Sequence, residues 1–117
     1  MSNDMNQTMH DFKEGMNMMV NEAPTVMKAF DGFMNEVLCN RALDSKTKEL
    51  IALGMAITAR CDYCIGIHVN RALLAGVTHA EIIEVCEVAI LMGGGPALTH
   101  IAEVKKALAL FEKTGPA

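Results

Sequence analysis

Apolar residues recur every three or four positions along most of this 117-residue chain. Residues 5–19 carry the repeat with Met and Phe, and residues 26–38 form a second stretch with a wide apolar face. This spacing places the side chains on one face of an α-helix, whereas a half-buried strand would alternate at every second residue. With one Tyr, four Phe and no Trp, the core must come from Met, Leu, Ile, Val and Ala, a composition that suits helices better than sheets. The sequence therefore predicts an all-α protein.

Start and stop signals divide the chain into about six helices. We expect them at about residues 5–20, 24–38, 45–59, 62–74, 78–91 and 96–111, with the glycine run at 93–95 as the last break. Pro24 suits a first helical position, Asp44 suits an N-cap, and Gly76 suits a left-handed stop. Thr78 and Glu81 form a capping box. The third helix is apolar nearly all round in its later turns, so we expect it to be central. Gly66, inside the fourth helix, costs about 1 kcal/mol relative to Ala and therefore suggests that another helix packs closely there.

Length and charge limit the classes of protein that are compatible with this sequence. The length predicts one domain covering residues 1–117. A formal net charge of −4 with scattered Lys and Arg gives no basic face, so we expect no nucleic-acid partner. We also expect no membrane partner and no signal peptide, since neither a long uncharged apolar run nor a basic leader is present. These features predict a cytoplasmic protein, in which cysteines are more often free, catalytic or metal-bound than structural bridges.

The stretch ARCDYCIGIH, residues 59–68, concentrates the reactive side chains. If a helix begins at Cys61, then Cys61, Cys64 and His68 lie on one face, and Cys64 and His68 are neighbours one turn apart. Near a helix N-terminus the free amides and the helix dipole favour a thiolate, and an adjacent imidazole can accept its proton. Such a pair can close into a disulfide and reopen by thiol exchange. The pattern favours a redox-active dithiol.

Two other interpretations stay open from the residues alone. Cys61 and Cys64 could be small buried residues with no chemistry. They could also belong to a zinc site completed by Cys39, Cys86 or His100, although structural zinc sites usually pair two such motifs and the chain has no second CxxC, CxxH or HxxxH. Cys39 and Cys86 lie on apolar helix faces, so we expect both to be core residues.

The longer stretch DSKTKELIALGMAITARCDYCIGIHVNRALLAGVTHAEIIE, residues 44–84, resembles the alkylhydroperoxidase AhpD-like branch of the carboxymuconolactone decarboxylase superfamily. The redox signature of that branch is a Glu, a CxxC twelve residues later and a His four residues after the second Cys. Glu49, Cys61, Cys64 and His68 meet it. The similarity covers about residues 42–111, which we expect to form the core of the domain. It implies an AhpD-like helical bundle with the CxxC pair at the start of the fourth helix, no cofactor or metal, and assembly into homo-oligomers, commonly trimers or hexamers.

The resemblance also implies an oxidoreductase, either a peroxiredoxin-type alkylhydroperoxidase or a disulfide reductase. It would act on a peroxide or disulfide substrate and be reduced by an external thiol, such as a lipoyl or thioredoxin-like dithiol. Cys64, activated through His68 and Glu49, would attack the peroxide, and Cys61 would resolve it as a disulfide. Tyr63 replaces a relay His of the best-known peroxidases, so we treat it as a candidate relay or substrate contact in a weaker or differently tuned enzyme. The alternative is a non-catalytic zinc-binding or oligomeric redox-sensing protein.

Overall fold

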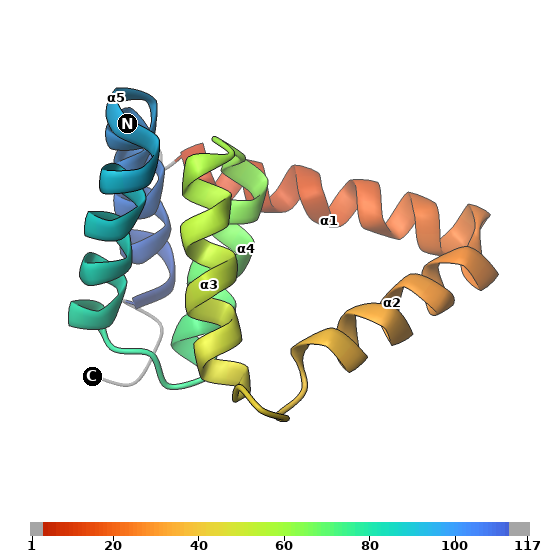
Figure 1. Cartoon of the computed structure of the whole chain (residues 1–117). Coiled ribbons are helices and arrows are strands. Elements are labelled where there is room, and N and C mark those ends of the chain that lie inside the picture. The colour runs from red at the N-terminus through yellow and green to blue at the C-terminus, as the bar shows by residue number, and fades with distance from the viewer. Residues whose placement is uncertain (1–3, 113–117) are drawn as a thin grey trace.

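Five α-helices and no strand make up residues 4–112, the part of the chain that the structure describes. In this computed structural model they are α1 (Asp4–Glu22), α2 (Pro24–Leu38), α3 (Ser45–Thr58), α4 (Asp62–Leu74) and α5 (His79–Phe111). Helices α3, α4 and α5 pack into a helical body, and α1 and α2 form an N-terminal arm that leaves the body and returns to it (Figure 1). The predicted all-α fold is confirmed, with Cys61 at the start of α4.

Local capping signals set where the helices begin and end, as the sequence predicted. Pro24 opens α2, and the Asp44 side chain caps α3 by accepting a hydrogen bond of 2.7 Å from a backbone amide in the first turn. Thr78 and Glu81 form a reciprocal capping box at the start of α5, and the Thr78 backbone amide holds the pKa of Glu81 below its usual range. Gly76 follows α4 with a φ of 93°, the left-handed conformation that glycine adopts most easily.

Helix α5 is one labelled element but contains a reversal at Gly94, where φ is 65° and ψ is −148°. Its two halves run side by side in opposite directions (Figure 1), and His79 Nδ1 at its start lies 2.8 Å from Glu112 Oε2 just after its end. The sixth helix predicted after the glycine run is therefore the second half of α5. By length and composition, α5 is the one helix within residues 4–112 that could cross a membrane, although its two halves fold back on each other.

The core lies between the three helices of the body and receives a contribution from α1. Its largest fully buried side chains in the body are Leu53, Ile57, Ile65, Val69, Ile82 and Val104. Helix α1 inserts Met5, and it approaches α4 so closely that a Cβ added to Gly66 would lie 2.5 Å from Met5 Sδ and 2.6 Å from Met9 Cε. The close helix packing predicted at Gly66 is thereby confirmed.

The N-terminal arm exposes much of its apolar surface. None of the residues of α2 is buried, and Val26, Phe30, Phe33 and Val37 are exposed at spacings of four, three and four, which place them along one face. Helix α3 packs against α2, α4 and α5, as its expected central place requires, but its outer side is open and Met55 is 66% exposed there. No part of residues 4–112 covers these apolar surfaces.

The arm is fastened to the body at both of its ends. At the end of α2, Lys48 of α3 donates hydrogen bonds of 2.7 Å to the carbonyls of Val37 and Cys39. At the start of α1, Met5 is buried in the core and Lys106 of α5 lies 3.7 Å from Asp4. The turn between α1 and α2 at Ala23 is the part of the arm that extends away from the body (Figure 1).

The two cysteines outside the CxxC motif lie in different environments. Cys86 is buried in α5, as expected, and this burial raises the pKa of its thiol. The expectation for Cys39 is wrong, because it follows the last residue of α2 and is exposed. The apolar helix face on which the sequence places Cys39 belongs to the uncovered arm.

Candidate active site

The turn between α3 and α4 positions the cysteine pair. Arg60 lies in the left-handed region with a φ of 57°, its amide donates to Ile57 O at 3.0 Å, and the Cys61 amide donates to Ala56 O at 3.1 Å. This bonding closes the end of α3 in the manner of a Schellman motif, in which glycine is the usual left-handed residue. A non-glycine residue there costs about 1 kcal/mol or more. The turn makes Cys61 the N-cap of α4.

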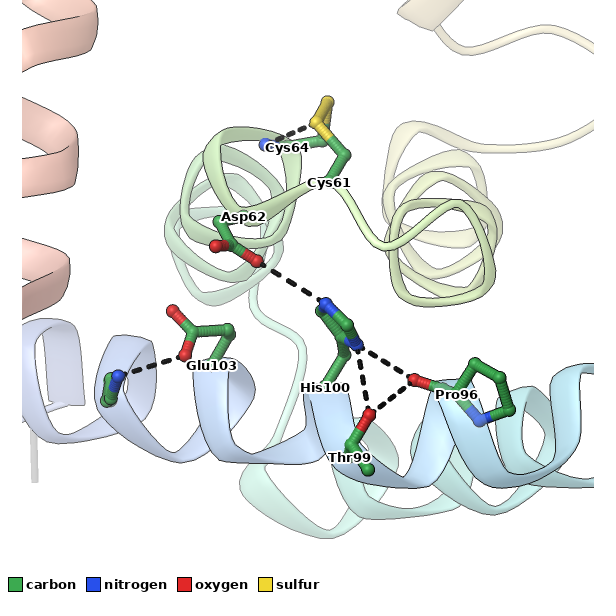
Figure 2. A network of polar contacts seen from close by, with 8 residues as sticks. Cys61, Asp62, Cys64, Pro96, Thr99, His100 and Glu103 are labelled. Carbon is green, nitrogen blue, oxygen red and sulfur yellow. Dashed lines mark hydrogen bonds and ion pairs between the residues drawn. A yellow bond between two sulfur atoms is a disulfide. The ribbon is translucent and has the colours of Figure 1, made fainter.

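Cys61 and Cys64 form a disulfide across the first turn of α4, with their Cα atoms 5.2 Å apart (Figure 2). The Cys64 backbone amide donates a hydrogen bond of 3.2 Å to Cys61 Sγ. After reduction, a thiolate at Cys61 would keep this amide and would lie at the positive end of the helix dipole. The local geometry therefore suits a cysteine that alternates between disulfide and thiolate.

Glu49 and His68, which the sequence placed near the dithiol, meet between α3 and α4. Glu49 is only 5% exposed, and its Oε1 lies 2.8 Å from His68 Nδ1. Because an ionised carboxylate only accepts hydrogen bonds, Nδ1 carries the hydrogen and donates a hydrogen bond to Glu49 Oε1. The other ring nitrogen, Nε2, is then the one able to accept a proton. His68 stands one helical turn after Cys64 on the same face of α4.

Arg71 is a member of the cluster that the sequence analysis missed. Its Nε lies 3.3 Å from the second oxygen of Glu49, so both carboxylate oxygens have a nitrogen partner. Its Nη1 also approaches Met34 Sδ on α2 at 3.7 Å. The signal was available, because Arg71 follows Cys64 by seven residues and His68 by three and so continues their helical face.

Tyr63 lies apart from the cluster of Glu49, His68 and Arg71. Its side chain is 47% exposed and lines a surface cavity of about 380 Å³ with residues of α1 that include Phe12 and Met16. The ring stands at the edge of the arm, beside the cysteine pair in sequence. It remains a candidate for contact with substrate.

His100 approaches the start of α4 but faces Asp62 instead of the sulfur atoms (Figure 2). Its Nδ1 donates to the carbonyl of Pro96 at 2.8 Å, and its Nε2 lies 3.9 Å from Asp62 Oδ1. Figure 2 shows the sulfur atoms of Cys61 and Cys64 on the other side of the helix start. The polar contacts of His100 are thus with Thr99, Pro96 and Asp62 and not with the sulfur atoms.

Within residues 4–112, no three side chains of His, Cys, Asp or Glu gather in a way that could hold a metal ion. The ligands considered for zinc are dispersed: Cys39 is exposed at the end of α2, Cys86 is buried in α5, and His100 faces Asp62. The side chains that do meet at this site are the imidazole of His68, the carboxylate of Glu49 and the guanidinium of Arg71.

Comparisons with known proteins agree with the fold and the sequence pattern. An uncharacterised protein of Cupriavidus necator is 37% identical over 89 residues, which are 76% of each chain. A carboxymuconolactone decarboxylase family protein from Legionella pneumophila has a crystal structure that superposes with a TM-score of 0.85 at 34% identity, covering 96% of this chain and 97% of that one. A member of the same family from Thermotoga maritima, suggested to take part in an antioxidative response, superposes with a TM-score of 0.72 at 28% identity, covering 91% and 88%.

The family model provides the same assignment independently of the structures. It matches residues 24–107, a range that includes α2, α3, α4, most of α5 and all four residues of the redox signature. The fold, the relatives and the family model together show that the chain belongs to the carboxymuconolactone decarboxylase family.

Proposed function

We propose that this protein is a thiol-dependent peroxidase or disulfide reductase whose reactive groups are Cys61 and Cys64. The observation that supports this most is the placement of a disulfide at the N-terminus of α4 with the Glu49–His68 pair on the same face of that helix. A purely structural disulfide has no need for a buried carboxylate aligned with an imidazole one turn away. The antioxidative role suggested for the Thermotoga maritima relative is consistent with this proposal.

The oxidative half of the reaction begins at Cys64. His68 Nε2 accepts the proton of the Cys64 thiol, and Glu49 stabilises the resulting imidazolium through Nδ1. The thiolate attacks one oxygen of the hydroperoxide, the O–O bond breaks, and the departing alkoxide takes a proton and leaves as an alcohol. Cys64 is then a sulfenic acid. The Cys61 thiolate attacks its sulfur, water leaves, and the disulfide seen in the structure forms.

The reductive half needs an external dithiol. One thiolate of the donor attacks the disulfide to give a mixed disulfide, and the second donor thiol releases the reduced protein. Cys61 is the N-cap of α4, so exchange at this sulfur is favoured by its position at the end of the helix. A lipoyl or thioredoxin-like dithiol has the required chemistry. Run on a disulfide substrate, the same exchange gives a disulfide reductase.

Counting thiols before and after oxidation tests the proposal. The reduced Cys39→Ser variant has three cysteines, and one equivalent of cumene hydroperoxide should remove two thiols within minutes. Cys64→Ser in this background should abolish the pairwise loss, whereas Cys86→Ser should keep it because Cys86 is buried away from the pair. If the thiols persist with peroxide but are consumed by a small disulfide such as lipoamide, the protein is a reductase. Persistence with both oxidants would refute the proposal.

We also propose that the chain assembles into a homo-oligomer, a trimer or a hexamer. The exposed apolar face of α2 and an apolar groove of about 540 Å³ between α3 and α5, which includes Ile51 and Val88, are both uncovered. A second copy can bury both surfaces together. Sedimentation velocity should show one species larger than the 12.7 kDa chain, and replacing Phe30 and Phe33 by Asp should dissociate it. A wild-type monomer at micromolar concentration would contradict this assembly. The cytoplasmic location stays a prediction.

A further inference from the structure

Arg71 is not part of the redox signature, but it contacts Glu49, which is. It shares Glu49 with His68: the guanidinium nitrogen Nε lies 3.3 Å from one carboxylate oxygen and the imidazole nitrogen Nδ1 lies 2.8 Å from the other. The guanidinium is held from a second side by Met34 Sδ, 3.7 Å from Nη1. Its side chain is about one-third exposed, whereas Glu49 is buried.

A buried carboxylate requires a positive partner. Two groups can provide that charge to Glu49, and they differ in kind. A guanidinium is charged at every pH that the protein meets, whereas an imidazole gains or loses its charge near neutrality. With Arg71 in place, Glu49 is already compensated before any proton reaches His68.

We propose that Arg71 is a positioning residue whose fixed charge, acting through Glu49 and His68, lowers the pH at which Cys64 becomes reactive. This inference builds on the proposed function, because it assigns a regulating group to the same dithiol. Removing a nearby cation destabilises a thiolate, so the Cys64 thiol should retain its proton to higher pH when Arg71 is lost.

The groups surrounding the cluster come from every helix that packs against it. Helix α3 supplies Glu49 and α2 supplies the uncharged Met34. Helix α1 supplies Lys13 and α5 supplies Phe111, which line a cavity of about 240 Å³ together with Arg71. Lys13 is exposed and forms no ion pair with the Glu49 carboxylate, which makes it a matched control for a nearby charge that is not bonded to Glu49.

The size of the effect follows from Coulomb's law. Arg71 lies two helical turns, about 10 Å, from Cys64, and a unit charge at that distance is worth about half a pH unit at an effective dielectric constant of about 40. We expect the midpoint of Cys64 reactivity to rise by about 0.5 pH unit when Arg71 is replaced by Met.

The test is the pH dependence of Cys64 alkylation by iodoacetamide in the reduced full-length protein, quantified at the Cys64 peptide by mass spectrometry. Arg71→Met should move the midpoint to higher pH, Arg71→Lys should restore it to the parent value, and Lys13→Met should leave it unchanged. Melting curves of all variants identify any that fail to fold, and Arg71→Lys provides a folded comparison that retains the charge.

An Arg71→Met midpoint equal to that of the parent would overturn the proposal, even if the overall rate fell, because a purely structural role predicts no shift. Equal shifts in Arg71→Met and Lys13→Met would also overturn it, since any nearby charge would then serve. Alkylation requires no peroxide. A shifted midpoint in a protein that consumes neither peroxide nor disulfide would support the role of Arg71 and refute the proposed function.

Discussion

Replacing Glu49 by Gln tests the mechanism most directly. Gln has nearly the same shape as Glu, and its amide oxygen can still accept a hydrogen bond from His68 Nδ1, so the imidazole keeps a hydrogen-bond partner. The variant removes the negative charge that stabilises the imidazolium and leaves Arg71 without its counter-ion. The substitution therefore removes the charge at residue 49 while keeping the position of the His68 ring.

The expected loss of rate can be worked from the contact. Removing one group that stabilises charge as it develops in the transition state costs about 10²- to 10³-fold in rate. Because the hydrogen-bonded position is kept in Glu49→Gln, we take the lower end and expect about a 10²-fold loss, which corresponds to about 2.7 kcal/mol of barrier. The Glu49–His68 distance of 2.8 Å and the 5% exposure of Glu49 mean that water cannot replace the missing charge.

The assay is the second-order rate of thiol loss with cumene hydroperoxide at pH 7, followed by stopped-flow under single-turnover conditions. Glu112→Gln is a matched control, because Glu112 pairs with His79 at the same 2.8 Å but on an exposed surface. The control should react at the parental rate. A Glu49→Gln rate within about threefold of the parent, in a folded protein, would refute the view that this carboxylate assists the thiol.

Three further predictions concern stability and the remaining cysteines. Gly66→Ala should lower the free energy of unfolding, measured in urea, by about 1–2 kcal/mol, because overpacking outweighs the gain in helix propensity. Gly32→Ala should raise the free energy of unfolding by about 0.5–1 kcal/mol, because the space around Gly32 is open. Equal effects would contradict the close packing of α1 on α4. The pKa of Glu81 is lowered in the folded protein, mainly by the hydrogen bond from the capping amide of Thr78. Its contribution to folding stability is therefore complete above the ordinary pKa of 4.5 and is lost as the pH falls through the lower pKa of the folded state. The urea stabilities of Glu81→Gln and the parent should thus differ at pH 7 and converge as the pH falls below 4.5. Iodoacetamide should modify Cys39 within minutes and leave Cys86 unmodified in the native protein, because Cys86 is buried and the pKa of its thiol is raised. Equal labelling of the two cysteines would contradict the burial of Cys86.

Local signals allowed the helices to be predicted closely. The bounds of α2 and α4 agree with the expected residues, because a proline, an N-cap and a left-handed glycine act within one turn of the backbone. Gly94 was predicted as part of a break, but the direction of the chain after it depends on how the two halves of α5 pack. Sequence patterns limited to one helix cannot specify that packing.

The candidate site was predictable only where one helix or a family signature supplied the geometry. Cys61, Cys64 and His68 share α4, so their common face followed from periodicity. Glu49 comes from α3, and its assignment depended on the resemblance. Arg71 continues the same face of α4, but its contact with a buried carboxylate is set by the packing of α3 against α4. Exposure of Cys39 was not predictable, since an apolar helix face does not show whether the same chain covers it.

The attachment of the N-terminal arm at both ends has a consequence for proteolysis. Its outer corner at Ala23 lies where neither Lys48 nor the buried Met5 holds it directly. A protease that cuts this corner would separate α1 from the rest of the polypeptide without releasing it, because Met5 stays buried in the body and α2 remains covalently joined to α3. The nicked protein would migrate as a single species on a native gel and as two bands in detergent.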